Sequence, residues 1–130
     1  MLIPKEIEEA KDRFEKAEVL TDPNKKAEEL NEGLDLIELY LEDNPNCSPD
    51  IKQYIKNLKR AHTRVLLRQL TELPEVDMET WINYIILFAI KLKDVVDYVT
   101  KNDDYLRKIH DEFWEIHRDE FIKLARRAGY

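Results

Sequence analysis

Cysteine, glycine and long apolar runs are scarce in this chain of 130 residues. Cys47 is the only cysteine and cannot form an intramolecular disulfide, so we expect a reducing compartment and predict a cytoplasmic protein. The longest nearly apolar run, 81–90, is too short to span a bilayer, so we expect no membrane association. Residues 1–6 lack a basic stretch followed by an apolar one, so we expect no signal peptide.

Apolar and charged residues are plentiful, at 43% and 38% of the chain. This apolar content is enough for one core without a metal or disulfide, so we predict a single domain spanning residues 1–130. Four prolines, at positions 4, 23, 49 and 74, each stand at the head of an amphipathic stretch with helical periodicity. We therefore predict an all-α bundle of about five mostly antiparallel helices, covering about 3–20, 23–43, 49–73, 78–100 and 104–128.

Capping residues support these boundaries. Asp22, Ser48 and Asp77 each stand where an N-cap is expected. The last boundary contains neither glycine nor proline, but one helix from 78 to 128 would be about 75 Å long. Because that length exceeds a domain of this size, we predict a break at Asn102–Asp103, with Asp103 or Asp104 as the cap.

The segment 78–100 is the most apolar of the five. Its apolar residues surround nearly the whole helical circumference, so we predict that it is buried on all sides at the centre of the bundle. Gly33 interrupts the 23–43 helix, and a close helix crossing at this position would explain it.

Charge is segregated along the sequence, within a formal net charge of −7. Residues 1–50 carry 6 basic and 15 acidic side chains, whereas residues 51–73 carry 6 basic and one acidic. Five of these cations form a ridge at i,i+4 spacing: Lys52, Lys56, Arg60, Arg64 and Arg68. Two interpretations stay open. Either the ridge pairs with carboxylates of the preceding helix (Glu28, Glu32, Asp35, Glu42), or it binds an external anion, such as an acidic partner helix or a phosphate backbone.

The last helix carries a second apolar face beside the stripe that contains Phe113. This face comprises His110, Trp114, His117 and Phe121. We interpret it as a candidate surface for a partner or a second copy. His110 and His117 are two turns apart, about 10 Å along the helix, which is too far to share a metal ion.

Chemistry-bearing motifs are otherwise lacking. The sequence contains no metal-binding helix motif, no glycine-rich phosphate loop and no histidine close to Cys47 in sequence. We therefore expect no catalytic residues, no metal and no cofactor. The sequence predicts a non-enzymatic interaction or assembly module that presents helix faces to a protein partner or to itself. The alternative is a small subunit of a nucleic-acid complex that contacts phosphates through the basic ridge, which the negative net charge disfavours.

Overall fold

The computed structural model describes residues 2–72, 77–127 and 129, except for the side chains of residues 71, 81, 121, 124 and 125. All regular elements in this described part are helices, which confirms the all-α class. It contains six α-helices, one more than predicted. The chain separates into two compact units, Met1–His62 and Thr63–Tyr130, and each is described by itself. A single domain stays a prediction.

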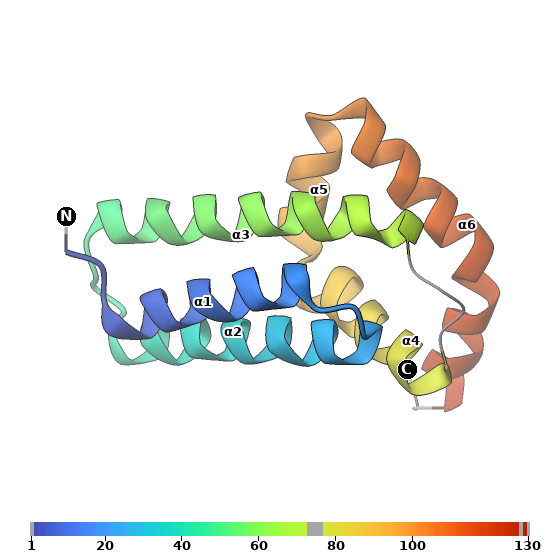
Figure 1. Ribbon diagram of the computed structural model, residues 1–130, viewed down its shortest axis with the longest axis horizontal. Coiled ribbons are helices and arrows are strands. Elements are labelled where there is room, and N and C mark those ends of the chain that lie inside the picture. Colours follow the sequence, from blue (N-terminus) through green and yellow to red (C-terminus); the bar gives the residue numbers. More distant parts are fainter. Residues whose placement is uncertain (1, 73–76, 128, 130) are drawn as a thin grey trace. The chain divides into compact units, whose positions relative to one another are not determined.

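The first unit consists of α1 (Lys5–Val19), α2 (Pro23–Asp43) and the first part of α3 (Pro49–Gln69). These helices run side by side and reverse direction at each connection (Figure 1). The Asp22 side chain accepts hydrogen bonds from the backbone N–H groups of Asn24 and Lys25, at 2.9 and 3.4 Å. Ser48 Oγ accepts from the backbone N–H of Ile51 at 3.3 Å. Both predicted caps are confirmed.

Close packing of α1 on α2 depends on Gly33. A Cβ atom added there would lie 2.5 Å from Phe14 Cε1 and 3.2 Å from the Ala10 carbonyl oxygen. The glycine therefore permits the close helix crossing that its position suggested. Around it, the apolar stripes of the three helices are buried: Ile7, Ala10, Phe14, Ala17, Ala27, Leu30, Leu34, Ile37, Ile55 and Leu58.

The second unit begins within α3, which ends at Gln69 and is followed by a 3₁₀ turn, η1 (Leu70–Glu72). The predicted helix end at Leu73 lies outside the described residues. Next come α4 (Met78–Ile85), a π-helical segment η2 (Ile86–Lys91), α5 (Lys93–Lys101) and α6 (Asp104–Arg127). Asp77 caps α4 through the Thr80 N–H at 2.8 Å, as predicted.

The segment 78–100 differs from the prediction of one helix buried on all sides. At η2 the backbone N–H of Leu92 donates to the Leu87 carbonyl at 2.7 Å, a spacing of five residues. A π turn takes up one extra residue, and each residue occupies about 100° of an α-helix, so the apolar stripe changes direction there. Ile90 is consequently 62% exposed and Ile82 36%, while Leu87 and Leu92 are buried.

The last two helices meet at the predicted break. α5 ends at Lys101 and α6 begins at Asp104, and from this turn the two helices run in opposite directions (Figure 1). Asp103 is the cap, because its carboxylate accepts from the backbone N–H groups of Tyr105 and Leu106 at 3.0 and 3.1 Å. Leu106, Ile109 and Phe113 form the buried stripe of α6.

Candidate interaction surfaces

The basic ridge of Lys52, Lys56, Arg60, Arg64 and Arg68 lies along α3. Lys52, Lys56 and Arg68 are exposed, while Arg60 and Arg64 are half-buried. The boundary between the two units falls between Arg60 and Arg64. The part of the ridge within the first unit, Lys52, Lys56 and Arg60, is called the basic row below.

Two carboxylates of α2 bind cations of α1. Glu29 accepts from Arg13 at 3.1 Å and pairs with Lys16 at 3.1 Å, and Glu32 also pairs with Arg13. Within the described side chains of the first unit, no carboxylate lies at salt-bridge distance from Lys52 or Lys56. The predicted internal pairing of the ridge therefore does not hold for these two lysines.

Burial and neighbouring charges shift the pKa values of two side chains in the first unit, Glu29 and Lys59. Burial tends to raise the pKa of Glu29, but hydrogen bonds from Lys16 and Arg13 outweigh this effect, and the net pKa is lowered. Burial lowers the pKa of Lys59, which the nearby Glu38 carboxylate partly opposes. Arg13, Lys16 and Lys59 therefore interact with carboxylates of α2, and these three cations do not belong to the ridge.

On the second apolar face of α6, side chains of the helix contact one another. Trp114 Nε1 donates a hydrogen bond of 2.8 Å to His110 Nε2. Because an indole N–H can only donate, His110 Nε2 must be the unprotonated acceptor, and its Nδ1, 3.4 Å from Asp111, carries the proton. His117 packs on Phe113 with ring centroids 5.1 Å apart, and burial lowers its pKa. The Phe121 side chain lies outside the described part.

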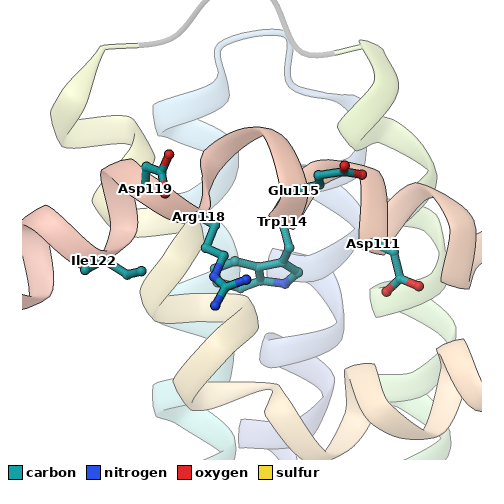
Figure 2. Close-up of a pocket in the computed structure, with 6 residues that line it drawn as sticks. All are labelled: Asp111, Trp114, Glu115, Arg118, Asp119 and Ile122. Atoms are coloured by element: carbon teal, nitrogen blue, oxygen red, sulfur yellow. The ribbon is translucent and has the colours of Figure 1, made fainter.

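A groove of about 690 Å³ lies along α6. Its described lining forms two rows at i,i+4 spacing: Asp111, Glu115 and Asp119 in one, and Trp114, Arg118 and Ile122 in the other. Glu115 and Asp119 point to one side of the groove, while Asp111, Trp114 and Arg118 point to the other (Figure 2). The Trp114 ring therefore lies between the carboxylates of Glu115 and Asp119 on one side and that of Asp111 on its own side.

Electrostatically, the groove favours a cation. Three carboxylates and one guanidinium leave its described lining with a net charge of −2. Trp114 and Ile122 are half-buried, whereas the four charged residues are exposed. A ligand that suits this lining combines positive charge with aliphatic or helical surface.

Sequence reasoning identified only Trp114 among the groove residues. Carboxylates on exposed helix faces are ordinarily solvated, so Asp111, Glu115 and Asp119 do not stand out in the sequence. The available signal was the four-residue spacing of three carboxylates next to a tryptophan on one helix. Periodicity could not show that this side of α6 is left uncovered.

The described part of the chain also shows how its metal-ligating residues, its cysteine and its helices are disposed. In this part of the chain, no three His, Cys, Asp or Glu side chains come together in a way that could hold a metal ion. Cys47 is a half-buried free thiol. No described helix has the length and apolar character that a bilayer crossing requires. Comparison of the chain with protein-family models, with curated proteins and with solved structures gives no match.

Proposed function

We propose that this protein is a non-enzymatic interaction module whose α6 groove binds a basic helical segment of a protein. The observation that carries this proposal is the groove itself, in which half-buried Trp114 lies beside the carboxylates of Asp111, Glu115 and Asp119. Tryptophan is the residue type most enriched among side chains that dominate binding energy. The single cysteine fits a reducing compartment, and we place this function in the cytoplasm.

Helix packing explains why the ligand is a helix. The groove lies between two adjacent i,i+4 rows of α6. Such a groove receives an i,i+4 row of another helix in the commonest class of helix crossing. Lysine or arginine in that row would reach the carboxylates with their charged ends and cover Trp114 with their aliphatic stems.

A peptide titration tests this function. The probe is a synthetic helical peptide with lysine at every fourth position, and its control is the same peptide with glutamate there. We expect the lysine peptide alone to shift the indole N–H signal of Trp114 in NMR spectra, the signal being assigned with the Trp114→Phe variant.

Variants of the groove sharpen this test. Trp114→Ala should weaken binding of the lysine peptide roughly 30-fold, as for an interface hot spot. Replacing Glu115 and Asp119 by lysine should abolish it. The matched control replaces Glu8 and Asp12, two exposed carboxylates of α1, by lysine. Equal binding of both peptides, or an equal loss in the control, would contradict the proposal.

The alternative, phosphate binding through the basic ridge, is tested with a single-stranded oligonucleotide. A nucleic-acid subunit would bind it with an affinity that falls steeply with salt, because counterions are released from the phosphates. Exposed Lys52 and Lys56 supply cations for such contacts. Residues 1–50, with 6 basic and 15 acidic side chains, oppose the approach of a polyanion. We therefore favour a protein ligand.

A further inference from the structure

Two rows of opposite charge and equal spacing occur on different helices of this chain. The acidic row, Asp111, Glu115 and Asp119, lies on α6. The basic row, Lys52, Lys56 and Arg60, lies on α3. In both rows the charges are four residues apart, which corresponds to about 6 Å along an α-helix. Each carboxylate of one row could therefore face one cation of the other.

Each row contains residues that have no ion-pair partner among the described side chains of their own unit. Lys52 and Lys56 have no carboxylate at salt-bridge distance among the described side chains of the first unit. Among the described side chains of the second unit, no cation lies at salt-bridge distance from Glu115 or Asp119. Like charges at i,i+4 spacing repel one another, so an opposite charge supplied from outside would stabilise Lys52 with Lys56 and Glu115 with Asp119.

We propose that the segment bound in the α6 groove is the basic row of α3 from a second copy of this chain, an inference that rests on the proposed function. The i,i+4 ridge of α3 has the spacing that the groove between the two α6 rows accommodates. The lysine ammonium groups then meet Glu115 and Asp119, and their stems cover Trp114.

Self-assembly follows from having both surfaces on one chain. Each copy offers one groove and one basic row, so copies pair either reciprocally, as a closed dimer, or head to tail. The net charge of −7 opposes association at long range, and salt at physiological concentration screens that repulsion beyond about 8 Å. At short range, the opposite charges of the two rows then determine which surfaces come into contact.

A charge-swap experiment on the full chain tests the proposal. One variant carries Lys52→Glu with Lys56→Glu, and the other carries Glu115→Lys with Asp119→Lys. Sedimentation velocity over a concentration series should show an oligomer for the unaltered protein and a monomer for each variant alone. Mixing the two variants should restore association at a 1:1 ratio, because the intact row of each then meets the intact row of the other.

Matched controls distinguish the loss of contacts between the two rows from the effect of a changed net charge on association. Lys5→Glu with Lys25→Glu, and Glu8→Lys with Asp12→Lys, change the net charge equally at other exposed positions and should leave the oligomer intact. Circular dichroism confirms that every variant is folded, and single reversals at Lys56 or Glu115 replace any double variant that is not.

The outcomes distinguish this inference from the proposed function. A monomeric unaltered protein, assembly that persists in both variants, or a mixture that does not associate would overturn the second copy as ligand. If the lysine peptide still binds the groove in that case, the proposed function stands with another partner. If the peptide fails as well, both proposals fall.

Discussion

In the hairpins α1–α2 and α5–α6, the C-terminus of the first helix is capped in the same way, but the two caps differ in their exposure to solvent. In each, a cation on the second helix donates to the last carbonyls of the first. Lys26 Nζ bonds the carbonyl oxygens of Ala17 and Glu18 at 3.0 and 3.1 Å. Arg107 bonds those of Thr100 and Lys101 at 3.2 and 2.9 Å. Both cations satisfy carbonyls that the helix leaves unpaired and complement the negative end of its dipole.

Access to water distinguishes the two caps. Lys26 is only 9% exposed. The Arg107 side chain is 49% exposed and lines a hollow of about 360 Å³ together with Thr100 and Lys101. Water can replace Arg107 as the hydrogen-bond donor to the carbonyls of α5. It can replace Lys26 at the carbonyls of α1 much less readily. We therefore expect two caps with the same hydrogen bonds to differ in their contribution to stability, because only one of them excludes solvent.

Lys26→Met gives the largest expected effect. The change keeps most of the aliphatic stem and leaves the carbonyls of Ala17 and Glu18 without their buried donor. We expect the free energy of unfolding to fall by about 2–3 kcal/mol, as for the loss of buried hydrogen bonds to a charged group. Urea unfolding followed by circular dichroism measures it. The control is Lys25→Met, an exposed neighbour; similar losses in both variants would refute the role of burial.

Gly33→Ala tests the close packing of α1 on α2 in the first hairpin. The new methyl group would meet the Phe14 ring at 2.5 Å. Overpacking costs about 1–3 kcal/mol and alanine returns about 1 kcal/mol of helix propensity, so we expect a net loss of about 1 kcal/mol. In a Phe14→Leu background the ring is absent and the 3.2 Å contact with the Ala10 carbonyl oxygen remains, so the same change should cost less than in the unaltered protein. Additive effects of the two substitutions would count against this contact.

Arg107→Met is the counterpart of the lysine substitution in the second hairpin. Because water can reach the carbonyls of Thr100 and Lys101, we expect a loss of only about 0.5 kcal/mol, the typical contribution of an exposed cation at a helix C-terminus. The same unfolding measurement applies. If Arg107→Met lowered the free energy of unfolding as much as Lys26→Met does, exposure to solvent would not determine how much each cap contributes to stability.

Local features of this fold could be predicted from the sequence, and features that depend on packing could not. The caps at Asp22, Ser48, Asp77 and Asp103 depend on residues within one turn of the helix, so composition and spacing reveal them. The π turn has no such local signature, because the same apolar run fits an α-helix.

The candidate site follows the same division. Trp114 was identifiable from its position beside the buried stripe. The groove was not, because only packing decides which side of α6 stays uncovered. The role of Lys26 likewise depends on tertiary structure, which brings its ammonium group to the end of α1.

His117 gives the smallest expected effect and shows how far the second unit excludes water. Burial lowers its pKa from the ordinary value of 6.5, so the folded state favours the neutral imidazole. The unfolded chain then binds more protons just below pH 6.5, and the contribution of His117 to stability, present above that pH, declines as the pH falls. Urea unfolding at neutral and mildly acidic pH should show a smaller loss of stability on acidification in His117→Phe than in the unaltered protein. An equal loss in both would mean that the ring beside Phe113 is as well hydrated as the exposed Arg107 cap.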